Sequence, residues 1–106
     1  MLDVIFRFAL YWDMIKSFGD KATHSIWRGE SVRRVHIDLQ KMARRKLRMV
    51  DAAPELGALR IPPSNELEAL QGNLKGFYSI RVNKQWRIIF RFHGGDAFDV
   101  TLVDYH

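Results

Sequence analysis

The chain of 106 residues has no cysteine, only three prolines and no apolar run long enough to cross a bilayer. The lack of cysteine excludes disulfide bonds, thiolate chemistry and cysteine-ligated zinc, and it is typical of a reducing cytoplasm. A membrane-spanning helix needs about 20 apolar residues, whereas the apolar opening at residues 1–13 is shorter and contains Asp3 and Arg7. The opening also lacks the basic start and cleavage site of a signal peptide. We therefore expect a cytoplasmic protein without a membrane partner.

Several motifs that define common enzyme classes are also missing from the sequence. There is no phosphate-binding P-loop, no dinucleotide-type glycine motif, no Gly-x-Ser-x-Gly nucleophile motif and no helix-turn-helix signature. Three of the four histidines, His24, His36 and His93, lack the spacing of metal ligands. The sequence therefore predicts neither a metal site nor a bound cofactor.

Positive charge is what the chain does have, with 17 lysines and arginines against 12 aspartates and glutamates and a net charge of +5. A small basic domain predicts a polyanionic partner, with nucleic acid ahead of a membrane surface. The length predicts one domain, which we place at residues 14–106 because Met14 opens the first strand-like segment. Residues 1–13 are then an N-terminal extension. They either lie upstream of the true start or add a strand or helical turn that covers a sheet edge.

The clearest predicted element is an amphipathic helix over residues 38–52, which ends before Pro54. Its apolar stripe, at steps of three and four residues, consists of Leu39, Met42, Ala43, Leu47 and Val50. A cationic stripe on a different face consists of Lys41, Arg44, Arg45 and Arg48. One side of this helix is therefore expected to pack on the core, while the other side is strongly cationic.

The remaining elements predict an α+β fold. A short strand is expected at residues 15–18, and a short helix capped by Asp20 follows it and runs to Trp27. Residues 54–66 are expected to form a loop. The apolar period then changes to two, which predicts strands at residues 77–82, 86–92 and 97–103 joined by tight turns. The expected architecture is an N-terminal strand, two helices and a three-stranded antiparallel meander packed on the helices.

Alternation along these strands divides the sheet into two faces. Like charges across neighbouring strands destabilise a sheet, so three arginines on one face predict an anion that binds there. Guanidinium groups suit phosphate because they donate hydrogen bonds in pairs and stay protonated. The alternative is a solvated surface on which Asp99 neutralises one arginine. The face expected to pack on the helix carries Tyr78, Ile80, Val82, Trp86, Ile88, Phe90, Phe98, Val100 and Leu102, and the opposite face carries Ser79, Arg81, Arg87, Arg91, Asp99 and Thr101.

Residues near the arginines fit acid–base chemistry on a ribose phosphate. RNA cleavage without a metal needs a base for the 2′-hydroxyl, an acid for the leaving 5′-oxygen and cations for the phosphorane. Glu68 as the base, His106 as the acid and Arg87 as the cation meet these needs. Tyr105 adds a hydroxyl and a ring on which a base can stack. The alternatives are an ordinary surface position for Glu68 and a solvent-exposed tail for Tyr105 and His106.

Longer blocks of the sequence resemble a known family. The stretch LEALQGNLKGFYSIRV at residues 67–82, then WRIIF at residues 86–90, GDA at residues 95–97 and VDYH at residues 103–106 resemble HigB-type toxins of the RelE superfamily. MIKSF at residues 14–18 resembles their start, so the likeness covers residues 14–106. The combination of Trp-Arg-Ile with a terminal Asp-Tyr-His is its specific part.

The resemblance implies a RelE-like fold and a ribosome-dependent endoribonuclease that cuts translated messenger RNA in the A site. It also implies a HigA-type helix-turn-helix antitoxin as the partner, with operator DNA bound only through that antitoxin. By position, Arg87 matches a phosphate-contacting arginine, and Tyr105 and His106 match the terminal catalytic pair. Asp104 matches the acidic residue beside that pair. Together with Asp104, the expected RNA-binding residues are Lys75, Arg81 and Arg91.

Two positions depart from the pattern of the resembled family. Glu68 stands where some HigB toxins have a histidine, whereas other RelE relatives use a glutamate there as general base. Gln71 stands where many members have a lysine, which removes a cation that Lys75 or Arg81 is expected to replace. This loss keeps a second function open, namely a catalytically weak or inactive module that binds RNA or an antitoxin and regulates without cleavage. A basic structural protein of the ribosome is a third function, which no feature specifically supports.

Overall fold

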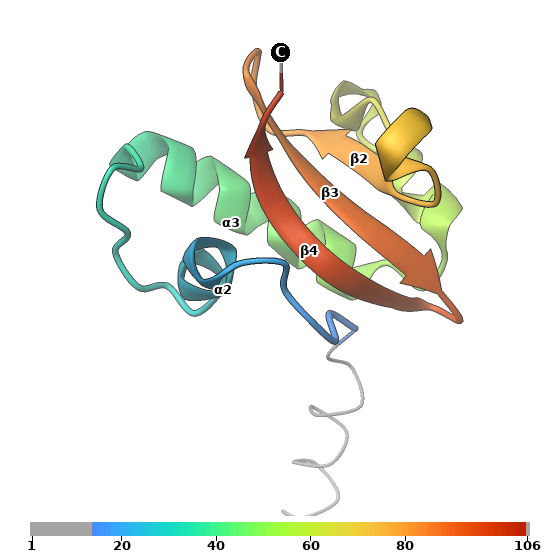
Figure 1. Ribbon diagram of the computed structural model, residues 1–106, viewed down its shortest axis with the longest axis horizontal. Helices are drawn as coiled ribbons and strands as arrows, with labels where there is room; N and C mark the ends of the chain where they lie inside the picture. Colours follow the sequence, from blue (N-terminus) through green and yellow to red (C-terminus); the bar gives the residue numbers. More distant parts are fainter. Residues whose placement is uncertain (1–13, 106) are drawn as a thin grey trace, which may run out of the picture.

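The computed structural model describes residues 14–105 (Figure 1). The predictions for residues 1–13 and for His106 lie outside the described residues. No helix among residues 14–105 is both long enough and apolar enough to span a membrane. The elements in chain order are α2 (Lys21–Trp27), α3 (Ile37–Ala52), the 3-10 helices η1 (Leu56–Arg60) and η2 (Pro63–Asn65), β1 (Glu68–Ala69), the 3-10 helix η3 (Gly72–Leu74), β2 (Tyr78–Arg81), β3 (Trp86–His93) and β4 (Asp96–Asp104).

The sheet has four strands in the order β1-β2-β3-β4, and each neighbouring pair is antiparallel. Strands β2, β3 and β4 are the predicted meander, so the α+β class is confirmed. The turn between β3 and β4 uses Gly94 and Gly95 at φ values of 59° and 83°, which glycine adopts without strain. Strand β1 is an addition to the predicted sheet, and it pairs with β2 at Glu68↔Ser79 and Ala69↔Tyr78.

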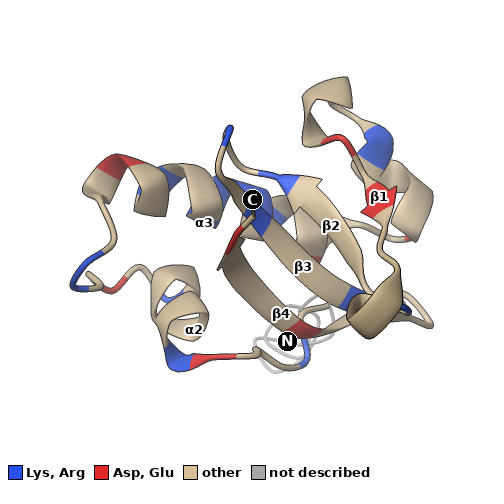
Figure 2. Cartoon of the chain, turned by 45° about the horizontal axis from the view of Figure 1, so that its top comes forward, with Lys and Arg blue, Asp and Glu red and all other residues tan. Residues whose placement is uncertain are grey.

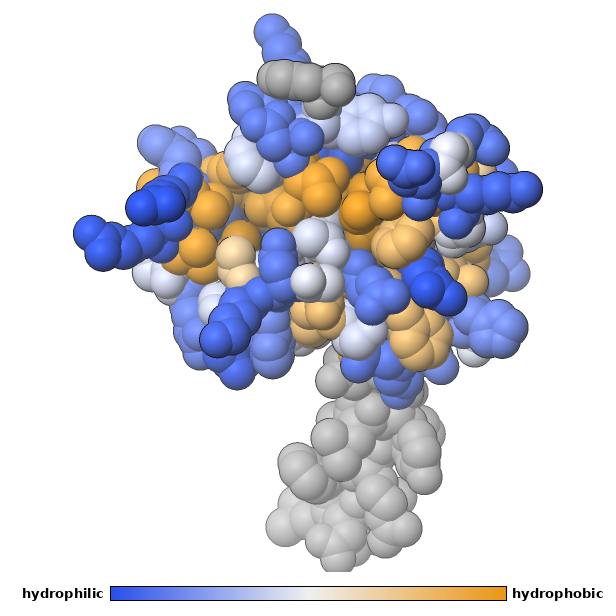
Figure 3. Space-filling model, in the orientation of Figure 1, coloured by the Kyte–Doolittle hydropathy of each residue, from blue (hydrophilic) through white to orange (hydrophobic). Residues whose placement is uncertain are grey.

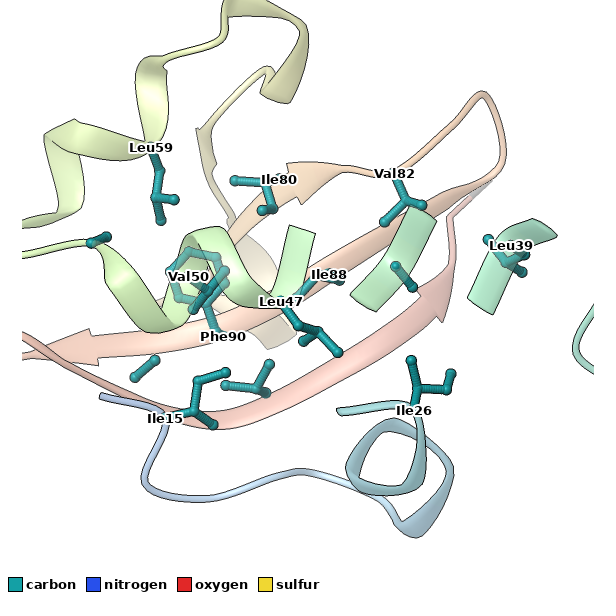
Figure 4. Close-up of a cluster of buried hydrophobic side chains, with 14 residues drawn as sticks. Ile15, Ile26, Leu39, Leu47, Val50, Leu59, Ile80, Val82, Ile88 and Phe90 are labelled. Atoms are coloured by element: carbon teal, nitrogen blue, oxygen red, sulfur yellow. The ribbon is translucent and has the colours of Figure 1, made fainter. Parts of the chain in front are cut away.

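Helix α3 covers one face of the sheet and confirms the predicted amphipathic helix (Figure 1). It begins after His36, whose Nδ1 accepts a hydrogen bond from the Asp38 amide at 3.1 Å. The core lies between α3 and this sheet face (Figure 4), and we call the opposite sheet face the open face. One core cluster includes Leu39, Ala43, Leu47 and Val50 of α3 together with Ile80, Ile88, Phe90 and Val100 of the sheet.

Helix α2 lies beside β4, at the edge of the sheet (Figure 1). Asp20 caps it as predicted, because the Asp20 carboxylate accepts a hydrogen bond from the Thr23 amide at 2.8 Å. The buried Thr23 hydroxyl accepts a second hydrogen bond from the Leu102 amide at 2.9 Å. This bond fixes α2 against the strand that leads to the C-terminal residues.

The predicted strand at residues 15–18 is not a regular strand. An extended ladder is interrupted because β4 bulges beside it: Asp99 has a φ of 54°, and its amide donates to Ser17 Oγ at 2.8 Å. The segment therefore makes only two isolated parallel bridges to β4, which are Ile15↔Ala97 and Phe18↔Val100.

The same bulge overturns the predicted direction of Phe98. The register passes from Ile89↔Thr101 to Arg91↔Phe98, so three steps along β4 match two along β3. Phe98 is therefore paired with Arg91 on the open face, whereas its neighbour Ala97 is fully buried on the helix side. Strict alternation fails here because it does not allow for the extra residue.

Figure 3, in the same orientation as Figure 1, shows an apolar band bordered by hydrophilic side chains on the viewed surface.

Candidate active site

Arg87 lies on the open face and is almost fully buried, with 6% of its surface exposed. Its Nε donates to Ser79 Oγ at 2.9 Å, and its Nη2 donates to the main-chain carbonyl of Glu66 at 2.5 Å. A buried guanidinium is costly unless its donors are paired and its charge is balanced. These bonds hold the Arg87 guanidinium in one orientation before any ligand binds.

Glu68 supplies part of the balancing charge. Strand β1 places Glu68 Oε1 3.4 Å from Arg87 Nη2, and the Glu68 side chain is 48% exposed. Glu68 also pairs in register with Ser79, which puts it on the same sheet face as Arg87. The structure thus brings two predicted site residues together, with a half-exposed carboxylate beside a fixed guanidinium.

Tyr105 joins this pair from the C-terminal end of the chain. The centroid of its ring lies 5.4 Å from Arg87 Cζ, which is a cation–π distance. Its amide donates to the Gln85 carbonyl at 2.6 Å, so the pairing of the last strand continues by one residue. The Tyr105 residue is 40% exposed and offers a ring and a hydroxyl beside Arg87. His106, the next residue, lies outside the described residues, so its role stays a prediction.

Each of the three predicted arginines has a carboxylate partner on the open face. Arg81 stands opposite Arg87 in register, and its Nε lies 3.7 Å from Glu66 Oε2. Arg91 Nη1 lies 3.7 Å from Asp99 Oδ2. The Glu66 and Asp99 side chains are 54% and 49% exposed, so these ion pairs are weak. The like charges are therefore offset in part within the protein, and a phosphate can compete with these two carboxylates.

The other predicted RNA contacts lie away from the Arg87 guanidinium. Arg91 follows Arg87 by four residues on the same face, and it lines a hollow together with Lys75. Asp104 pairs in register with Trp86, which packs against the core, so Asp104 belongs to the helix side of β4. The structure thus brings Lys75 and Arg91 together at one hollow, whereas Asp104 lies on the helix side of β4 and accepts a hydrogen bond from Gln85 Nε2 at 3.0 Å.

Asn65 supports the site from the α3 side, and no pattern in the sequence identifies it as a site residue. It is fully buried, and its amide nitrogen donates to the Leu59 carbonyl at 3.1 Å while its Oδ1 accepts from Lys46 Nζ at 2.5 Å. Asn65 thereby ties the loop to α3 at the position before Glu66, whose carbonyl holds Arg87. The role of a buried asparagine can be recognised only from its hydrogen-bond partners in the folded structure.

Lys46 is in an unusual environment for a lysine. Burial is the main cause that lowers the pKa of Lys46 from its ordinary value of 10.5, and the nearby charges of Arg45 and Arg81 lower it further. Arg81 of the open face is the smallest of these three causes.

The cluster of Glu68, Arg87 and Tyr105 combines a carboxylate, a fixed guanidinium and a phenol. Among residues 14–105, no three histidine, aspartate or glutamate side chains are grouped so that they can hold a metal ion. Figure 2 shows acidic and basic segments close together on the strands of the sheet. In this cluster the carboxylate can take up a proton, the guanidinium can neutralise developing negative charge, and the phenol ring can stack on an aromatic ring.

The fold agrees with that of a solved structure. The chain resembles the YoeB dimer from Staphylococcus aureus with a TM-score of 0.53 and 19% sequence identity. The match covers 88% of this chain and 98% of that one. At this identity the likeness shows the fold alone, which is the RelE-like α+β fold that the sequence predicts.

The sequence matches are more specific than the fold. Residues 16–106 match the family described as RelE-like toxin of type II toxin-antitoxin system HigB. The chain is 55% identical over 62 residues to Toxin HigB-1 of Vibrio cholerae, a match that spans 58% of this chain and only 64% of that toxin. It is 33% identical over 93 residues to Endoribonuclease HigB of Proteus vulgaris, covering 88% of this chain and 100% of that protein. The chain therefore belongs to the HigB-like family of type II toxins.

Proposed function

We propose that the chain is an endoribonuclease that cleaves messenger RNA in the ribosomal A site. The relative from Proteus vulgaris carries the name of an endoribonuclease. The observation that carries the proposal is the contact between Glu68 Oε1 and Arg87 Nη2 at 3.4 Å, beside the Tyr105 ring. A base and a phosphate-binding cation on one open surface are two of the three groups that RNA cleavage without a metal requires.

The proposed reaction uses acid–base chemistry on one phosphodiester. Glu68 takes the proton of the 2′-hydroxyl, and the 2′-oxygen then forms a bond to phosphorus. The bond from phosphorus to the 5′-oxygen breaks as His106 gives that oxygen a proton. Arg87 stabilises the negative charge of the phosphorane that forms before this bond breaks. The products are a 2′,3′-cyclic phosphate and a free 5′-hydroxyl.

The anchoring of Arg87 matters for this role. Two of its donor groups are already bonded to Ser79 and to the Glu66 carbonyl, so the guanidinium does not reorient when the phosphate charge develops. The half-exposed Tyr105 ring can stack on a base beside the scissile bond. Glu68 must leave its contact with Arg87 when phosphate binds, and its exposure allows that movement.

The proposal extends to partners and location. As a type II toxin the chain has an antitoxin partner, and we assign this role to a HigA-type helix-turn-helix protein that alone contacts operator DNA. The antitoxin is expected to cover the open face with acidic or apolar segments. The proposed site of action is the cytoplasm, on translating ribosomes.

A binding module without cleavage is the second candidate function. It is favoured by Gln71, an exposed neutral residue at the start of η3 where the resemblance leads one to expect a lysine. The carboxylate partner of Arg81 favours it as well, because it reduces the charge available to a phosphate bound at Arg87. On this reading the protein binds RNA or its antitoxin and regulates without cutting.

Induction of the chain in bacteria, followed by primer extension on translated messages, distinguishes the two functions. We expect new cut ends with the wild type and loss of these ends by about 10²- to 10⁴-fold for Glu68→Gln and His106→Ala. Lys41→Ala, which changes an exposed cation of α3, is the control and is expected to cut like the wild type. Translation arrest by the wild type without cut ends would establish the binding module instead.

A further inference from the structure

A second feature of the open face lies further along β3 from Arg87. It is a hollow of about 630 Å³ whose lining includes Lys75, Phe77, Arg91, His93, Phe98 and Asp99, and we call it the Phe77–Phe98 pocket. Arg91 is four residues beyond Arg87 on the same strand and face, which corresponds to about 13 Å at the rise of an extended strand. A strand of RNA held at Arg87 can therefore reach the pocket within a few nucleotides.

The lining of the pocket combines aromatic rings with basic side chains. Phe77 and Phe98 are half-buried, while Lys75 and Arg91 are exposed. The Arg91 guanidinium carbon lies 5.9 Å from the centroid of the Phe77 ring. Rings that stack bases, next to cations that follow the phosphates, are how proteins hold single-stranded nucleic acid without a duplex.

A bulge in the backbone of β4 places Phe98 in this pocket. The bulge turns Phe98 out of the core and onto the open face, where it pairs with Arg91. At the bulge, Asp99 adopts a φ of 54°, a conformation that is uncommon for a residue other than glycine. A phenylalanine that leaves the core forgoes part of its burial, and bulges beside functional sites often redirect a side chain in this way.

We propose that the Phe77–Phe98 pocket is a second nucleotide subsite, in which the two rings hold one base of single-stranded RNA and Lys75 and Arg91 hold its phosphate. The loose pair between Arg91 and Asp99 gives way to that phosphate, because both side chains are about half exposed. The inference rests on the proposed function, since it continues the RNA that is bound at Arg87. It concerns binding and does not involve the cleavage step.

The test measures binding of the full-length protein to labelled single-stranded RNA by fluorescence anisotropy. The probe carries 2′-O-methyl groups, so it has no 2′-hydroxyl to be attacked, and a dinucleotide of the same chemistry is too short to occupy the Arg87 cluster and the pocket together. We expect Phe98→Ala to weaken binding of the longer RNA about tenfold and to weaken binding of the dinucleotide less. Phe98→Leu keeps apolar bulk without a ring, and it should weaken binding in the same way while its unfolding midpoint stays near that of the wild type.

A second variant tests the phosphate contact. Lys75→Ala should reduce the slope of log affinity against log salt concentration by about 0.7, the value for one phosphate contact on a single strand. The matched control Lys41→Ala, which removes an exposed cation from α3, should leave both affinity and slope unchanged.

Three results would overturn the subsite. One is wild-type affinity for the longer RNA in Phe98→Ala and Lys75→Ala while both variants still cut translated messages, which leaves the proposed function intact. Another is a loss of antitoxin binding with RNA binding unchanged, which would assign the pocket to the antitoxin. The third is failure of the wild-type protein to bind the longer probe at all. Failure of the proposed function is separate, since it appears as the absence of cut ends with the wild type.

Discussion

Arg87 and Arg91 lie on the same strand and the same face, four residues apart, yet their surroundings differ. The Arg87 side chain is 7% exposed and bonded to a buried serine hydroxyl and a main-chain carbonyl. The Arg91 side chain is 60% exposed and has one carboxylate partner at 3.7 Å. Each guanidinium also lies near one aromatic ring, at 5.4 Å for Arg87 and 5.9 Å for Arg91.

The difference shows that sequence position alone does not set the role of an arginine. A guanidinium that is fixed before the ligand arrives loses little freedom and can stabilise charge in a transition state. A guanidinium that is exposed and loosely paired can follow a flexible strand, and it contributes to affinity more than to rate. We therefore expect one end of the open face to govern cleavage and the other to govern binding.

Among the variants that compare the two arginines, the largest effect is expected when Arg87 is replaced by lysine. Arg87→Lys keeps the charge but loses the fork that reaches Ser79 and Glu66 together, so the cleavage rate should fall about 10²- to 10³-fold. Arg91→Lys should change the rate by less than about tenfold, because an exposed pair contributes about 1 kcal/mol or less. Single-turnover cleavage in a translating extract measures both. Equal losses in the two variants would remove the distinction between the two ends.

A smaller effect is expected from Ser79→Ala, which deletes one anchor of Arg87 without touching Arg91. Ser79 is fully buried, so its loss leaves the Arg87 Nε unpaired and should lower the free energy of unfolding by about 1–3 kcal/mol. Cleavage should weaken while affinity for the uncleavable RNA stays near the wild-type value. Ser31→Ala, at an exposed position between the helices, is the matched control and should change neither quantity. A Ser79→Ala protein with wild-type stability and activity would show that the anchor is dispensable.

The smallest effect is expected at Lys46. It donates a hydrogen bond to Asn65, the residue before Glu66, whose carbonyl holds Arg87. The pKa of Lys46 is lowered in the folded chain by burial and by Arg45 and Arg81, so between that pKa and 10.5 the unfolded chain binds more protons than the folded one. The free energy of unfolding should therefore gain a rising contribution from this residue as the pH increases through that window. Lys46→Gln keeps a donor for Asn65 and removes the titration. Denaturant unfolding of both proteins from neutral pH to about pH 10 should show a difference that grows with pH, and a constant difference would contradict the assignment.

The long elements of the fold could be predicted from the sequence because each has a strong local pattern. The stripe of α3, the Asp20 cap and the period-two strands depend on neighbours within a few residues. Strand β1 has only two residues, too few to show any period. The reversal of Phe98 depends on the backbone at Asp99, where a register shift cancels the alternation that the sequence displays.

The site likewise has one part that the sequence predicts and another that it does not. The shared face of Arg81, Arg87 and Arg91 follows from alternation, which makes it visible in the sequence. The contact of Glu68 with Arg87 needs β1 to pair with β2, so spacing alone does not predict it. The anchors of Arg87 are the Ser79 hydroxyl and a main-chain oxygen, and nothing in the sequence distinguishes them from other serines and other main-chain oxygens.

The contacts along β4 also determine how the sheet can meet other chains. Its outer edge is occupied at the Ile15 and Phe18 bridges and again where the Leu102 amide donates to Thr23. An incoming peptide therefore has no continuous row of free amides and carbonyls to extend the sheet at this edge. Strand addition at β4 would first have to displace residues 15–18 from this edge, so a partner that meets this edge must recognise side chains instead of extending the sheet there.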